Sequence, residues 1–110
     1  MTENYFEEVP AAVTIADAGG AIVYMNAASK KAFEAHGNLI GTDLFDCHPE
    51  PSKTKLKELV KEQRTNVYSI ERNGVKKMIY QGPWRKEGIY AGFFEITFEV
   101  PSEIPHFVRK

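Results

Sequence analysis

Two short apolar runs near the start of the chain predict a β-hairpin that leads into a helix. Residues 12–16 are apolar apart from Thr14, residues 21–25 are almost wholly apolar, and both runs suit buried strands rather than helices. The Gly-Gly pair between them supplies a tight reversal. Asn26 then predicts the N-cap of a short helix, because its side-chain oxygen can accept a backbone N–H of the first turn, and Gly37 predicts the end of that helix.

A second helix is predicted from Pro51 onward. Leu56, Leu59 and Val60 recur at helical spacing among lysines and glutamates, which predicts a narrow apolar stripe that faces a sheet. Residues 38–52, between the two helices, predict a loop with one short helical turn, because two prolines and a glycine interrupt them.

The period of the pattern then changes from helical to extended. Residues 66–72 and 75–81 flank Asn73-Gly74, the strongest short-range signal for a hairpin with a type I′ turn, since both central residues need positive φ. Residues 84–88 predict a connection to a last strand over residues 89–100. Alternation along that strand separates two faces, and we expect Phe94 and Ile96 to face the helices, with Phe93 and Thr97 on the outer side.

The order of these elements predicts an α+β fold, a five-stranded antiparallel sheet with helices packed on one face. A length of 110 residues with 43% hydrophobic composition suits one domain. We therefore expect a single domain over residues 1–110, with a core from about residue 9 to residue 100 and terminal extensions at 1–8 and 101–110.

Three short motifs, in order along the chain, resemble those of the PAS domain family of sensor and interaction modules. Ile22, Tyr24 and Asn26 resemble the family's second strand and its helix-capping asparagine. Leu39-Ile40-Gly41 is similar to the usual entry to its middle helices. The last strand resembles the family's final strand at Tyr90, Gly92, Glu95, Ile96 and Thr97.

The resemblance implies a pocket between the sheet and the middle helices that holds haem, flavin, an organic acid or only side chains. Carried onto this sequence, it implies that the pocket is lined by the apolar stripe of the second helix and by the last three strands. The expected lining residues are Leu56, Leu59, Val60, Tyr68, Met78, Tyr80, Phe94 and Ile96. Because protein interiors are close-packed, these side chains also suit a core without a ligand.

A haem or redox sensor that uses Cys47 and His48 is the alternative. The Pro49-Glu50-Pro51 turn before a basic helix resembles haem-binding PAS oxygen sensors, yet their iron-ligating histidine corresponds here to Leu56. A thiolate or an imidazole can ligate iron, so Cys47 and His48 are the candidate ligands. No cofactor is otherwise indicated, and no metal site is expected, since the histidines and the cysteine lack paired spacing.

The chain carries no residue set that predicts catalysis. Cys47 and His48 are adjacent, and neighbouring residues rarely aim both side chains at one atom. Glu95 and Glu99 on one strand face would lie about 13 Å apart, beyond the ~9.5 Å limit for inverting glycosidases. We therefore expect no catalytic residues and no enzyme activity.

Charge and composition limit the partners. Fourteen basic against fifteen acidic residues give a net charge of −1, which provides no general attraction to nucleic acid or anionic membranes. The single cysteine, an acidic N-terminus and the lack of a long apolar run favour a cytoplasmic location.

The sequence thus predicts a sensor and signalling module that binds a small ligand or a protein partner and transmits the change through its sheet face. We expect an exposed Phe93 beside Thr97 to form the interface of a homodimer, because exposed apolar surface on the outer face of the sheet marks an interaction site. The apolar residues of the two termini, such as Tyr5 and Phe107, are expected to add to it. The sequence does not identify the ligand or the downstream effector.

Overall fold

A computed structural model describes residues 4–110, except for the side chain of Cys47. The strands form one antiparallel sheet in the order β2-β1-β5-β4-β3. They are β1 (Ala12–Asp17), β2 (Ile22–Met25), β3 (Asn66–Arg72), β4 (Val75–Lys86) and β5 (Ile89–Val100).

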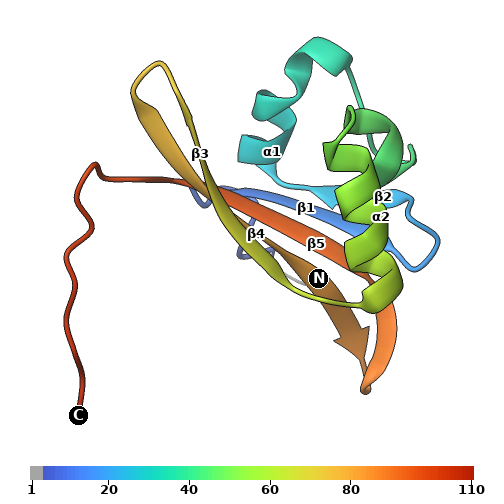
Figure 1. The fold of residues 1–110 in the computed structure, drawn as a ribbon. Coiled ribbons are helices and arrows are strands. Elements are labelled where there is room, and N and C mark those ends of the chain that lie inside the picture. Colours follow the sequence, from blue (N-terminus) through green and yellow to red (C-terminus); the bar gives the residue numbers. More distant parts are fainter. Residues whose placement is uncertain (1–3) are drawn as a thin grey trace.

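The helical elements follow β2 in the sequence and gather on one face of the sheet (Figure 1). They are α1 (Ala27–Ala32), η1 (Glu34–His36), η2 (Leu44–Cys47) and α2 (Ser52–Glu62). We call the helix-bearing side of the sheet the inner face and the opposite side the outer face. The α+β fold predicted from the sequence is therefore confirmed.

The side chain of Asn26 joins three parts of the chain and is fully buried. Its Oδ1 accepts the N–H of Ser29 at 3.0 Å, which is the predicted cap of α1, and also the N–H of Val13 in β1 at 2.9 Å. Its Nδ2 donates to the carbonyl oxygens of Phe6 and Ala11, each at 2.8 Å. Asn26 thus caps a helix and fastens the N-terminal turn and the start of β1 to it.

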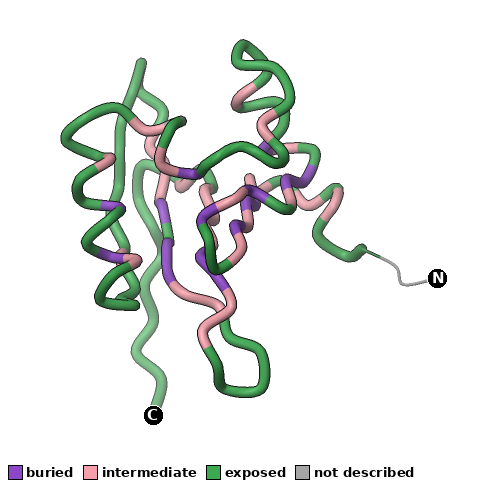
Figure 2. The backbone as a smooth tube through the Cα atoms, turned by 90° about the vertical axis from the view of Figure 1, so that its right-hand side faces the viewer, coloured by how far each residue is buried: buried purple, intermediate pink, exposed green. Residues whose placement is uncertain are grey.

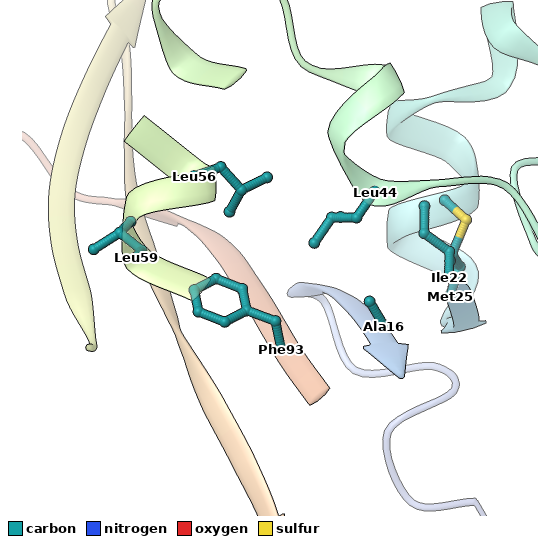
Figure 3. Packing of buried hydrophobic residues seen from close by; sticks show 7 residues of the cluster. All are labelled: Ala16, Ile22, Met25, Leu44, Leu56, Leu59 and Phe93. Atoms are coloured by element: carbon teal, nitrogen blue, oxygen red, sulfur yellow. The ribbon is translucent and has the colours of Figure 1, made fainter. Parts of the chain in front are cut away.

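The core lies between α2 and the inner face of β1, β2 and β5. Leu56 and Leu59 of α2 pack in one cluster with Phe93 of β5, so the predicted apolar stripe of the second helix does face the sheet (Figure 3). The remaining members of the cluster are Ala16, Ile22, Met25 and Leu44. Figure 2 shows buried positions along the strands and the helices, whereas the C-terminal tail is exposed throughout. No helix within residues 4–110 is long and apolar enough to cross a lipid bilayer.

The turns between the last three strands are both two-residue turns. Asn73 and Gly74 have φ of 53° and 79°, as predicted for a type I′ hairpin. Glu87 and Gly88, with φ of 52° and 81°, form a second such turn, so β4 runs on to Lys86 instead of ending before residue 84. Pro83 fits within β4 because β3 pairs with β4 only up to Gln81, which leaves that edge without ladder hydrogen bonds.

The two faces of β5 are the reverse of those that the sequence predicted. Phe93 is only 1% exposed and belongs to the core cluster, and Thr97 lines a cleft on the inner face. The prediction that these two residues form an exposed outer surface is therefore wrong. Alternation separates two faces but does not determine which one the helices cover. Phe93 fits beneath the helices because its partner in the register is the small Ala16.

We predict that Asn26→Ala lowers the free energy of unfolding by about 3–5 kcal/mol, because it removes a helix cap and leaves several buried backbone groups unpaired. Urea denaturation followed by circular dichroism measures this change. The matched control is Asn38→Ala, since Asn38 is exposed and its side chain accepts the local N–H of Ile40. A loss below about 1 kcal/mol for Asn26→Ala would contradict this account of the buried amide.

We also predict that Gly92→Ala separates β5 from β1. A Cβ atom at Gly92 would lie 2.0 Å from the carbonyl oxygen of Ala16 and 2.5 Å from Nε1 of Trp84, which donates to that same oxygen at 2.9 Å. Because Trp84 is the only tryptophan, its fluorescence should report a lower denaturation midpoint for this variant. Gly19→Ala is the control, since its nearest contact would be an ordinary 3.5 Å. Equal midpoints for the two variants would refute the steric argument.

Candidate functional site

An open cleft of about 780 Å³ lies between α1 and the inner face of the sheet. Ala28 and Ala32 of α1, together with Phe33, form one wall. The upturned β3–β4 hairpin, opposite α1 in Figure 1, contributes Ile70 and Lys77. The floor is formed by the sheet, with Thr14, Ile79, Glu95 and Thr97. We call this hollow the main cleft.

A second cavity of about 290 Å³ lies beneath the first turns of α2. We call it the side cavity. Two of the residues predicted to line a ligand pocket, Leu56 and Tyr68, line it. Its polar wall is formed by His48, Ser52, Lys55, Asn66 and Gln81.

Glu95 and His48 lie between the two hollows. Glu95 lines the main cleft, His48 lines the side cavity, and both border a space of only about 10 Å³ between them. Nε2 of His48 lies 3.5 Å from Oε2 of Glu95, and the two side chains are only 16% and 18% exposed. This pair therefore connects the lining of the main cleft with that of the side cavity.

A chain of polar contacts crosses the inner face through Glu95. Asn66 donates to Oε1 of Gln81 at 3.1 Å, and the amide of Gln81 donates to Oε2 of Glu95 at 3.0 Å. On the other side of Glu95, Nδ1 of His48 donates to the carbonyl oxygen of Leu44 at 2.9 Å. The contacts run from β3 through β4 and β5 to η2, so they connect the sheet to the helical segment.

Backbone hydrogen bonds hold the segment that carries His48 against β2. Leu44 donates to the carbonyl oxygen of Gly20 at 2.8 Å, and Ile22 donates to that of Thr42 at 2.8 Å. Asp43 caps η2 by accepting the N–H of Phe45 at 2.9 Å. His48 directly follows η2, so these bonds place its ring beside β5.

The surroundings of Glu95 keep its carboxylate ionised. Burial alone would raise its pKa, but hydrogen bonds from His48 and Gln81 and the positive charge available on His48 hold the pKa below its ordinary value. Burial and the negative charge of Glu95 raise the pKa of Tyr68, which therefore stays protonated. The inner face thus presents an ionised carboxylate beside His48, the neutral amide of Gln81 and the protonated hydroxyl of Tyr68.

Four of the eight residues predicted to line the ligand pocket lie on the outer face of the sheet, away from the helices. Gln81 pairs with Glu95 across β4 and β5, and Glu95 contacts the helical segment, so the flanking positions on both strands point to the outer face. The prediction that these residues face the helices is wrong for Met78, Tyr80, Phe94 and Ile96. Leu59 is buried in the core cluster, and Val60 packs half-buried against it.

Of the predicted Cys47-His48 pair, the structure describes the side chain of His48 only. His48 takes part in the polar chain, whereas the side chain of Cys47 lies outside the part of the structure that is described. In the remainder of residues 4–110, no group of three or more His, Cys, Asp or Glu side chains could hold a metal ion.

Sequence reasoning missed the polar residues of the site, which are Asn66, Gln81 and Glu95. The signal was a polar residue in the middle of an apolar strand, as in Ile-Tyr-Gln-Gly and Phe-Phe-Glu-Ile. Such a residue on an apolar strand either points to solvent or is paired inside, and only the cross-strand register shows that Gln81 and Glu95 meet.

Several solved structures share this fold. A C-terminal domain from Streptococcus mutans superposes with a TM-score of 0.69 at 19% identity, over 84% of this chain and 78% of that one. The PAS domain of the histidine kinase ThkA gives a TM-score of 0.65 at 14% identity, over 82% of this chain and 99% of that one. The PAS domain of Bordetella pertussis BvgS gives a TM-score of 0.65 at 13% identity, over 87% of this chain and 81% of that one. A search of curated proteins finds no match.

The sequence also matches a family profile described as a PAS domain over residues 2–100. That match covers nearly the whole chain, and it agrees with the five-stranded sheet and its inner-face helices. The resemblance seen in the sequence motifs is thereby confirmed, and this chain belongs to the PAS domain family.

Proposed function

We propose that this PAS domain is a signalling module that binds a small molecule in the main cleft and transmits the change through the outer face of its sheet to a partner chain. PAS domains are generally sensory, non-catalytic modules, and we extend that role to this chain. The observation that carries the proposal is the contact between Glu95 and His48, which joins the central strand to the helical segment at the edge of the main cleft.

The position of β5 provides the route of transmission. It lies in the middle of the sheet, and Glu95 on its inner face is flanked by Phe94 and Ile96 on its outer face. A ligand that shifts Glu95 therefore moves the backbone of a strand whose next side chains lie on the opposite surface. No chemical step is needed for this transfer.

The outer face is where we place a second copy of the chain. It carries an apolar patch in which Tyr80 packs edge-on against Phe94 with ring centroids 5.1 Å apart, while Tyr80 remains 42% exposed. The other large apolar members of this patch are Val67, Met78 and Ile96. Contiguous exposed apolar surface of this kind marks interaction sites. The cytoplasmic location and the lack of nucleic-acid or membrane binding stay predictions.

Native mass spectrometry of the purified protein tests this function. We expect a dimer that carries a non-covalent small molecule, and we expect Tyr80→Lys to convert it to a monomer, because two added charges would meet in a desolvated interface. Tyr68→Lys is the matched control, since Tyr68 is 40% exposed on the neighbouring strand but points to the inner face. A monomer without bound mass in the wild type would contradict the proposal, as would equal dissociation by both variants.

Haem binding is a second candidate function, supported by the orientation of His48. Its Nδ1 is held by the carbonyl oxygen of Leu44, which is how iron-ligating imidazoles are commonly oriented. Bound haem would supply an iron centre for gas or redox sensing. The carboxylate of Glu95 lies 3.5 Å from Nε2, where iron would bind, so the arrangement fits haem only if Glu95 moves away.

Absorbance spectroscopy separates the two candidates. A haem sensor would show a Soret band in protein expressed with haem supplied, and the band would be lost in His48→Ala or Cys47→Ala. We expect no such band, because Glu95 stands where the iron would bind. A stoichiometric Soret band that depends on His48 would replace the proposed function with this one.

A further inference from the structure

Glu95 is a largely buried carboxylate whose pairing within the chain depends on the charge of a histidine. Among the described side chains that contact it, Gln81 is a neutral amide. His48 already donates through Nδ1 to the carbonyl oxygen of Leu44, so Nε2 also carries a proton for Glu95 only when the imidazole is charged. When His48 is neutral, a lone pair faces the carboxylate instead. A buried carboxylate without a cation is costly, and a cation supplied from outside would be favoured there.

The main cleft gives such a cation access to Glu95. Glu95 lines the cleft, and its contacts with Gln81 and His48 are both made at Oε2. The charged side chains that line the cleft are Glu95, Glu99 and Lys77, which sum to one negative charge. The lining therefore attracts a small cation and repels a small anion.

The other walls of the main cleft suit an apolar body attached to that cation. Phe33, Ile70 and Ile79 provide apolar surface around the carboxylate, and Ala28 and Ala32 leave space on the side of α1. A volume of about 780 Å³ is within the range of small-molecule sites.

We propose that the main cleft binds a small organic ammonium ion with an apolar body, whose charged nitrogen pairs with Glu95 in place of His48. This inference rests on the proposed function and deepens it. The ligand and His48 compete for one carboxylate, so binding releases His48 from β5. Since His48 directly follows η2, the release is passed to the helical segment between β2 and α2.

Three probes of one shape test the chemical class: 2-phenylethylammonium, the neutral 2-phenylethanol and the anionic 3-phenylpropanoate. Each is titrated into ¹⁵N-labelled protein at neutral pH and low salt, and the amide shifts of Thr14, Glu95 and Thr97 report on the main cleft. We expect the ammonium to bind about tenfold more tightly than the alcohol, because it gains a charge-assisted hydrogen bond in a partly buried site, and the carboxylate to bind most weakly.

Variants on both sides of the pair make the test specific. Glu95→Gln should weaken ammonium binding by about tenfold and remove the preference over the alcohol. His48→Ala should tighten ammonium binding, because the internal competitor is gone. Glu58→Gln, on the exposed side of α2, removes the same charge away from the cleft and should change the affinity less than about twofold. The dispersion of each ¹⁵N spectrum shows that the variant is folded, and His48→Ala remains decisive if Glu95→Gln does not fold.

Three results would overturn the inference. Equal affinity for the alcohol and the ammonium, or ammonium binding that is unchanged in Glu95→Gln, would show that the cleft takes small molecules without selecting a cation, and the proposed function would survive. Absence of any shift in the main cleft with all three probes would reject the ammonium site. The bound mass in native mass spectrometry would then decide separately whether the domain carries another ligand.

Discussion

The buried amide of Asn26 is the interaction on which the rest of the arrangement depends. Four hydrogen bonds converge on one side chain, and they join the N-terminal turn, β1 and the first turn of α1. Because α1 has only six residues, it would not be stable in isolation. Its place above the sheet is set by this cap and by the bond between Thr14 and Ser29. The position of the cleft wall formed by α1 therefore depends on its capping residue, Asn26.

A second constraint comes from the burial of Glu95 in the central strand. A carboxylate in that position needs donors, and Gln81 and His48 supply them. Gln81 lies on the neighbouring strand, but His48 belongs to the segment that connects the two halves of the sheet. The need to satisfy one buried charge thus links the floor of the cleft to the helical segment. A ligand that offers the carboxylate of Glu95 a better partner would therefore weaken its contact with His48. An apolar contact in the same place would not respond to such a ligand.

Local chemistry made the fold predictable from the sequence. The Asn73-Gly74 turn and the cap at Asn26 each depend on residues close together in the chain, and both were predicted where the structure has them. The extension of β4 was missed because residues 84–88 were predicted to be a connection, whereas the turn needs only Glu87 and Gly88. The early end of β3 makes Pro83 acceptable within the longer strand. Leu56 and Tyr68 were placed on the inner face, whereas the polar residues of the site were not identified as a group.

By itself, the sequence determined the order of strands and helices, the turns between them and the resemblance to PAS domains, because periodicity, capping and turn residues act over a few positions. Only the tertiary structure decided which face of β5 lies beneath the helices. Both faces of that strand carry aromatic residues, so either could have been covered, and the choice rests on the space beside Ala16 for Phe93 and on the donors that reach Glu95 from β4 and from His48. These contacts join residues far apart in the chain, and their geometry exists only once the sheet has formed.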